Sequence, residues 1–215
     1  MNNGSPMAKA VEIAAGGVYG GRSATERRTD RRARLLEAAV EVLGTDGWAG
    51  TSVREICKRA GLNARYFYES FGGLEDLLVA VFDCIADESA QAAATAMAAA
   101  PADVAAQVRA AVSGLIGAIT ADPRKARIAY SEALGSEALM RRRLKHSHYL
   151  AVMLREARLT VDPDADRCHA VIQAEALSTG LAGAVVAWLG GYIDVDRDQF
   201  IDYCAQVVES ALLGG

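Results

Sequence analysis

Proline and aromatic residues are scarce in this chain of 215 residues. It contains 4 prolines, and Phe, Trp and Tyr together make up 6% of the residues. Because proline breaks helices and aromatic residues favour strands, their scarcity leaves room for long helices and argues against a sheet-based fold. Hydrophobic residues make up 52%, enough for a sizeable core in one small and one medium-sized domain. We therefore expect an all-α protein.

Clusters of metal-binding or catalytic residues are also missing. His146 and His148 are two residues apart, so on a helix they point to different sides and cannot easily share a metal ion. There is no phosphate-binding glycine loop and no Ser/His/Asp arrangement, which disfavours an enzyme on an all-α scaffold. We expect no catalysis, no metal, no cofactor, and free, mostly buried thiols in a reducing cytoplasm. The four cysteines are far apart in sequence: Cys57, Cys84, Cys168 and Cys204.

Long hydrophobic runs are few. Residues 1–21 lack the continuous apolar core of a secretory signal, and residues 1–22 show no periodic pattern, so we expect a disordered tail. Residues 176–193 carry no charge and approach the length of a membrane span. This stretch contains Ser178, Thr179 and four glycines and lies between charged segments, so we interpret it as a buried or interface helix and expect no membrane partner.

Charge is distributed unevenly along the chain. Residues 1–73 carry 11 Lys and Arg against 8 Asp and Glu, whereas residues 74–215 carry 12 against 19. This asymmetry is typical of a protein whose N-terminal part faces nucleic acid, although ordinary scatter could produce it too. A second basic run at residues 140–148 is more often a solvated helix face, and contact with an anionic effector is the alternative.

Three helices are expected before residue 74. Ser23 and Glu26 form a capping box for the first, which glycines at 44 and 47 should end. Thr51 or Ser52 starts the second, and Glu55 completes a capping box with Ser52. Gly61 ends this helix because glycine adopts a positive φ at little cost.

Asn63 is a good N-cap for a third, short helix that reaches to about residue 70. Two helices joined by a tight glycine turn make a helix-turn-helix, whose second helix enters the major groove with its N-terminal residues leading. These residues are candidates to read bases, since Arg pairs with guanine and Asn with adenine. They are Asn63, Ala64, Arg65 and Tyr66.

Candidate backbone contacts surround this helix. The N-terminus of the second helix offers free N–H groups to phosphate, which points to Thr51, Ser52 and the following Arg54. The first helix begins in an arginine-rich segment, residues 22–34. Most of it is as well explained as a solvated face, but Arg28 is a candidate for the phosphates or the adjacent minor groove.

Residues 34–78 resemble the DNA-binding domain of TetR-type regulators. The matching elements are Gly47-Trp48 with Thr51, the run Ile56-Cys57-Lys58-Arg59-Ala60-Gly61, Tyr68-Glu69-Ser70-Phe71, and Asp76-Leu77. The resemblance implies that Thr51 and Tyr68 contact phosphates and that residues 63–66 read bases. It also implies a small core made by Val53, Ile56, Ala60, Leu62, Phe67 and Phe71.

The chain departs from the family pattern at three positions. Leu74 stands where the family usually has a lysine that touches phosphate, which should weaken the sequence-independent part of DNA binding. Cys57 replaces a common alanine, a tolerable change for a small buried residue. Tyr66 replaces a smaller residue, so the base preference of relatives cannot be transferred.

The remainder of the chain is expected to form a second helical domain. Breaks at 101, 122–123, 135, 162–163 and 190–191 divide residues 74–215 into helices at about 74–100, 102–121, 124–134, 136–158, 164–190 and 195–213. The predicted organisation is therefore a tail (1–22), a helix-turn-helix domain (23–73) and a helical effector-binding and dimerisation domain (74–215), with about nine helices in all.

The resemblance implies a homodimer that pairs through the last two helices. Small and apolar residues at helical spacing fit this role, with completion of the monomer core as the alternative. The candidates are Gly180, Gly183, Ala187, Phe200, Cys204, Val207 and Val208.

The resemblance also implies a small-molecule pocket between the helices of the second domain. The candidate lining residues, for each of which plain core is the alternative, are Phe82, Met97, Leu115, Ile119, Tyr130, Met153, Leu177 and Trp188. Glu132 is either a polar anchor in this pocket or an exposed helix residue.

Together these features predict a cytoplasmic regulator that binds double-stranded operator DNA. We expect it to be a repressor that an unknown small molecule releases from the operator. The alternative is a helical adaptor protein whose helix-turn-helix no longer reads DNA, which the missing lysine at Leu74 favours slightly.

Overall fold

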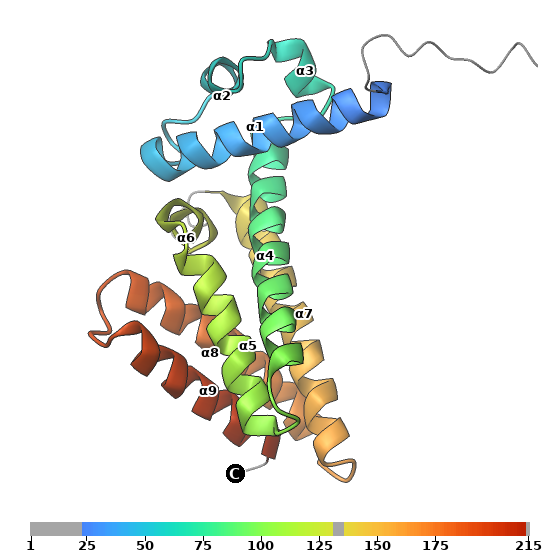
Figure 1. Ribbon diagram of the computed structural model, residues 1–215, viewed down its shortest axis with the longest axis vertical. Helices are drawn as coiled ribbons and strands as arrows, with labels where there is room; N and C mark the ends of the chain where they lie inside the picture. Colours follow the sequence, from blue (N-terminus) through green and yellow to red (C-terminus); the bar gives the residue numbers. More distant parts are fainter. Residues whose placement is uncertain (1–22, 131–135, 214–215) are drawn as a thin grey trace, which may run out of the picture.

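The computed structural model describes residues 23–130 and 136–213, which form nine α-helices and no strand, as expected. Helices α1–α3 lie across one end of the long helix α4, and α5, α6 and α7 pack along the rest of it (Figure 1). Helices α8 and α9 form an outer pair that packs on α7 and α5. The helices are α1 (Ala24–Asp46), α2 (Val53–Ala60), α3 (Ala64–Tyr68), α4 (Leu74–Ala99), α5 (Val104–Thr120), α6 (Pro123–Tyr130), α7 (Glu137–Val161), α8 (Arg167–Leu189) and α9 (Arg197–Leu213).

Side-chain caps begin the three helices before residue 74, as expected, but the expected capping box at Ser52 forms only one of its two bonds. Ser23 and Glu26 form both bonds of a capping box. Ser52, not Thr51, caps α2: its Oγ accepts from the Glu55 N–H at 3.2 Å. Asn63 Oδ1 accepts from the Tyr66 N–H at 3.3 Å and so caps α3. These bonds satisfy N–H groups that the helices themselves leave free.

Glycines define the turn and one close approach. Gly61 has φ 62° and ψ 37°, the left-handed conformation expected where α2 ends. Gly47, at φ 71°, ends α1. The expected stop at Gly44 is wrong, because α1 continues to Asp46. A Cβ at Gly44 would lie 2.4 Å from Arg124 Cβ, so this glycine allows α6 to approach the backbone of α1.

The main hydrophobic cluster joins the N-terminal helices to α4, α6 and α7. It contains every residue of the expected small core, with Ile56 and Phe67 fully buried, and continues through Leu78 of α4 to Ile128 of α6. The proposed domain boundary at residue 73 lies between α3 and α4, inside this shared core. The expected tail (1–22) and Glu132 lie outside the described residues.

Two smaller clusters complete the interior of the second half. One is built around Ile116, Val185 and Phe200, and the other around Val108, Val208 and Leu212. The thiols divide evenly rather than being mostly buried: Cys57 and Cys204 are buried, whereas Cys84 and Cys168 are exposed. Burial raises the pKa of the Cys57 and Cys204 thiols.

Candidate DNA-binding surface, effector region and dimer face

Helix α3 turns one side to the core and the other to solvent. Phe67 is fully buried and holds the helix against α1 and α4. Asn63, Ala64 and Arg65 are exposed, Tyr66 is half-buried, and Tyr68 is 62% exposed with its ring edge-on to Phe67 at 5.3 Å. The structure therefore brings the base-reading candidates and Tyr68 together on one short helix whose outer side is uncovered.

Glu69, which follows α3, contacts the candidate cations around it. Its Oε1 accepts from Arg65 Nε at 2.9 Å, and its Oε2 lies 4.0 Å from Arg31 Nη2. The Arg31 guanidinium lies over the Tyr66 ring, 4.4 Å from its centroid, and Arg28 Nη2 donates to the Glu69 carbonyl at 3.3 Å. Sequence reasoning missed Glu69, although its spacing of four residues from Arg65 signals a helical ion pair.

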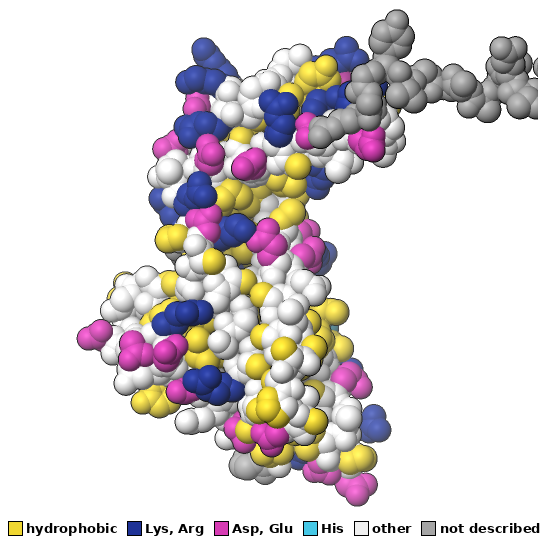
Figure 2. Space-filling view, in the orientation of Figure 1, with side chains coloured by type: hydrophobic (Ala, Val, Ile, Leu, Met, Phe, Trp, Pro, Cys, Tyr) yellow, Lys and Arg dark blue, Asp and Glu magenta, His cyan; other side chains and the backbone are white. Residues whose placement is uncertain are grey.

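The start of α2 supplies the other candidate contacts. Thr51 is half-buried and its Oγ1 donates to the Gly47 carbonyl at 2.7 Å, so its proton is used inside the protein. Ser52 and Arg54 are exposed. In the space-filling view, Lys and Arg side chains gather over α1–α3, with acidic side chains among them (Figure 2). A basic but mixed surface suits the edge of a phosphate backbone.

The eight candidate effector residues do not line one pocket. Leu115, Tyr130 and Trp188 meet around the cluster of Ile116 and Phe200, where Trp188 stacks on Phe200 with centroids 4.5 Å apart. The others are dispersed between the interior and the surface: Phe82 and Ile119 are buried, Leu177 packs in the third cluster, and Met97 and Met153 are 43% and 53% exposed.

Tyr130 is the most polar of the three convergent residues. Its phenol is largely buried, which raises its pKa. The Arg143 guanidinium lies 5.3 Å from the ring centroid, and Arg143 Nη1 donates to the Tyr130 carbonyl at 3.4 Å. Burial lowers the pKa of Arg143. Apolar side chains and the Arg143 guanidinium therefore meet around Tyr130.

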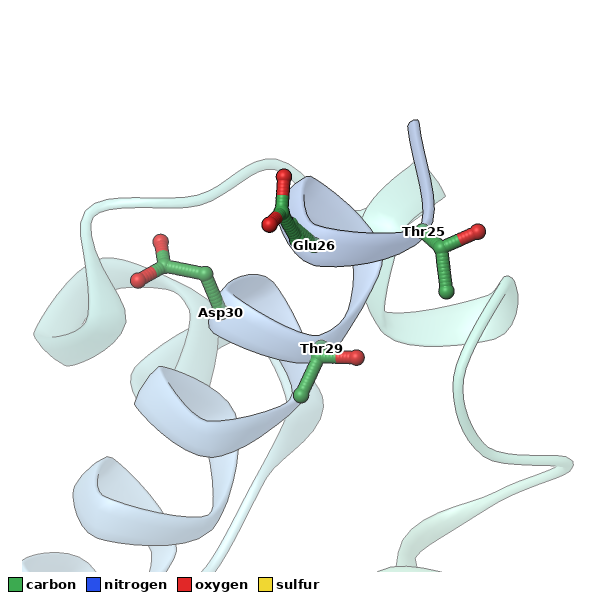
Figure 3. A pocket seen from close by; sticks show the side chains of 4 residues that line it. All are labelled: Thr25, Glu26, Thr29 and Asp30. Atoms are coloured by element: carbon green, nitrogen blue, oxygen red, sulfur yellow. The ribbon is translucent and has the colours of Figure 1, made fainter. Parts of the chain in front are cut away.

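Two other hollows are poor effector sites. A cavity of about 10 Å³ between α7, α8 and α9 has room for a single water, although Arg158 Nη1 is buried there without a partner among the described residues. A hollow of about 410 Å³ lies beside the start of α1, where Thr25 and Thr29 point to one side and Glu26 and Asp30 to the other (Figure 3). These four side chains do not converge.

The candidate dimer residues fall into two groups. Phe200, Cys204 and Val208 are buried in the monomer and so complete its core. The others are accessible: Val207 is 51% exposed, Ala187 is half-buried, and a Cβ at Gly180 or Gly183 would meet nothing within 4 Å.

Other apolar residues of α8 and α9 are also accessible, and sequence reasoning missed them. They are Ile172 (69% exposed) on α8 and Tyr203 (55%) and Leu213 (52%) on α9.

Helix α8 is long and apolar enough to cross a membrane by length and composition, and only 22% of its apolar window is buried in this chain. One such helix does not by itself indicate a membrane protein. Helices α5 and α6 pass the same test only as a pair, and they are bent by 100°. Among the described residues, no group of three His, Cys, Asp or Glu side chains could hold a metal ion.

Comparisons with known proteins agree with this geometry. Residues 35–81 match the family model of bacterial regulatory proteins, tetR family. The fatty acid degradation regulator FadR from Bacillus halodurans is 21% identical, with a TM-score of 0.65 over 86% of this chain and 95% of that chain. A TetR family transcription regulator from Marinobacter aquaeolei VT8 is 20% identical, with a TM-score of 0.61 over 87% of this chain and 97% of that chain.

FadR from Bacillus subtilis, solved in complex with stearoyl-CoA, is 20% identical, with a TM-score of 0.64 over 85% of this chain and 98% of that chain. No curated protein sequence matches the chain. The family match, together with α2 and α3 joined at Gly61, defines a helix-turn-helix DNA-binding domain. Residues 35–81 are therefore a DNA-binding domain of the tetR type, and the chain as a whole shares the fold of solved TetR-family regulators, proteins that are generally not enzymes.

Proposed function

We propose that the protein is a cytoplasmic repressor that binds operator DNA as a homodimer and is released from it by a small molecule. The observation that carries this proposal is the uncovered outer side of α3. Asn63, Arg65 and Tyr68 project from a helix that Phe67 fixes to the core. Such a helix can enter the major groove without rearrangement of the fold.

The proposed dimer joins α8 and α9 of two copies. A helix that is apolar all round is normally buried, yet α8 leaves most of its apolar window uncovered in the single chain. The bare surface at Gly180 and Gly183 allows another helix to come close, and Val207 and Tyr203 lie on the outer side of α9. A two-fold pair would place two copies of α3 about 34–36 Å apart, one turn of DNA.

The proposed effector site lies where Leu115, Tyr130 and Trp188 meet, between α5, α6 and α8. The stearoyl-CoA complex of the Bacillus subtilis relative supports an effector with an apolar part. An effector that favours one of two arrangements of α6 would change the spacing of the two recognition helices, because α6 packs on α1.

Selection from a random DNA duplex pool, followed by gel shifts at fixed salt, tests the DNA-binding part. We expect enriched duplexes with two half-sites. Arg65→Ala and Tyr66→Ala should abolish their specific binding while light scattering still shows a dimer. Tyr68→Phe should weaken binding to all sequences alike, because a phosphate contact carries no base information. If no duplex is enriched, the adaptor function that Leu74 favours replaces the proposal.

Trp188 fluorescence tests the effector part. In a Trp48→Phe background, the emission of Trp188 should change when stearoyl-CoA or another apolar anion binds, and the same ligand should release the selected duplex. Trp48 itself packs on the N-terminal core and serves as the control in a Trp188→Phe background. Release of DNA with no Trp188 response would contradict the proposed location.

A further inference from the structure

Glu69 is an acidic residue on a surface that should face phosphates. It is the one Asp or Glu in residues 63–70, and its side chain is 38% exposed. A carboxylate there repels DNA, so its position beside the base-reading candidates calls for a compensating role. Its contacts indicate that role.

The ion pair with Glu69 occupies one particular nitrogen of Arg65. Glu69 Oε1 accepts from Nε at 2.9 Å, while the Arg65 side chain is 83% exposed. Both terminal nitrogens, Nη1 and Nη2, are therefore left to point outward. A guanidinium held in this way can donate both of them to O6 and N7 of one guanine, the commonest specific contact in the major groove.

Helix α1 holds Glu69 from the other side. Arg31 Nη2 lies 4.0 Å from Glu69 Oε2, and Arg28 Nη2 donates to the Glu69 backbone carbonyl at 3.3 Å. Arg31 is itself held over the Tyr66 ring. An exposed ion pair within one helix is worth little by itself. A carboxylate fixed from two helices restricts the rotamers of Arg65 before DNA binds, which lowers the entropy lost on contact.

We propose that Glu69 is a positioning residue for base recognition: it holds Arg65 so that its Nη1 and Nη2 read a guanine end-on. This inference rests on the proposed DNA binding. Glu69 need not touch the DNA itself. It limits affinity for all DNA through its charge and increases discrimination for one base.

Base discrimination by Glu69 variants tests the proposal. With the selected duplex and duplexes that carry each other base at one position, replacement of the guanine read by Arg65 should weaken wild-type binding about tenfold. In Glu69→Ala this ratio should fall to about twofold, while affinity for random duplex DNA stays equal or rises. Glu69→Gln keeps an oxygen acceptor for Nε and should restore most of the ratio.

Matched variants separate positioning from other effects. Glu75→Ala removes an exposed carboxylate from α4 and should leave the ratio unchanged. In Arg65→Ala, adding Glu69→Ala should change the ratio no further. Equal melting temperatures for the Glu69 variants would show that the domain is intact.

Three results would overturn the inference while leaving the proposed function in place. Glu69→Ala could keep the tenfold ratio, Glu69→Gln could fail to restore it, or Arg65→Ala could remove no guanine preference from a duplex that the protein still selects. Failure to select any duplex would instead count against the proposed function.

Discussion

The helices near the two ends of the chain differ in how far their large apolar side chains are buried. In α1–α3, large apolar side chains such as Leu35, Ile56 and Phe67 are fully buried, and many charged side chains lie on the surface over them (Figure 2). In α8 and α9, Ile172 and Tyr203 are more than half exposed. The first region is complete within one chain because its core is closed. The second has the surface expected of a helix pair that a partner covers.

Among the predicted changes, removal of the Phe67 ring from the buried N-terminal core should have the largest effect. Phe67→Ala leaves a cavity at the centre of the closed core and should lower the free energy of unfolding by about 3–5 kcal/mol. Chemical denaturation followed by circular dichroism measures it. Tyr68→Ala, at the exposed neighbour, is the control and should change stability by less than about 0.5 kcal/mol. Equal losses would mean that α3 is not anchored as described.

A bulky residue at Gly183 tests whether a second copy of the chain covers the exposed surface of α8 and α9. Since no atom lies within 4 Å of a Cβ there, Gly183→Leu should fit the single chain and favour its helix. In the dimer it should cost about 1–3 kcal/mol by overpacking, which raises the dissociation constant at least about tenfold. Analytical ultracentrifugation measures this constant. Ala98→Leu, at an exposed position of α4, should leave the dissociation constant unchanged. An unaltered constant for Gly183→Leu would mean that the dimer interface lies elsewhere.

A lysine at position 74 tests whether the N-terminal region binds DNA as expected but lacks one phosphate contact of its family. Leu74 is half-buried against the core, and a lysine stem can lie along the same surface. Leu74→Lys should therefore add one phosphate contact and steepen the dependence of log affinity on log salt by about 0.9, for every sequence tested. Leu74→Met is the neutral control. A gain restricted to one sequence would contradict a phosphate contact.

The smallest expected effect is a pH dependence at His146, which joins α7 to α4. Burial lowers its pKa below the ordinary 6.5, Arg142 lowers it further, and Asp83 and Asp87 oppose both. The unfolded chain then binds the proton more tightly, so stability should fall as pH drops below about 6.5. Denaturation midpoints measured from pH 7.5 to 5 should change less in His146→Leu than in wild type. His169→Asn, at an exposed histidine, is the control.

Local signals predicted the N-terminal half well. The caps at Ser23, Ser52 and Asn63 and the left-handed Gly61 each depend on residues within three or four positions, so the sequence alone contains them. The small core followed from the resemblance to TetR-type regulators. The spacing of Glu69 from Arg65 signalled their ion pair, but the contacts of Glu69 with Arg31 and Arg28 come from another helix and could not be predicted.

Predictions for the second half were weaker because they depend on which helices meet. Apolar spacing in α9 identified Phe200 and Cys204, but it could not show that these face the monomer core while Tyr203 and Val207 face outward. Likewise, Met97 and Met153 have the chemistry of a pocket, yet tertiary packing leaves them exposed. Composition indicates that a residue is apolar; only the arrangement of helices decides what it contacts.

The close approach at Gly44 has a mechanical consequence. The backbone of α1 meets the stem of Arg124 with no side chain between them, while Arg127 Nη1 donates to the carbonyls of Gly44 and Thr45 at 3.2 and 3.1 Å. Because the contact uses backbone and the first carbons of Arg124, we expect a displacement of α6 to shift α1 as well. A side chain at position 44 should therefore separate α1 from α6 and weaken the coupling between the DNA-binding helices and the second half of the chain.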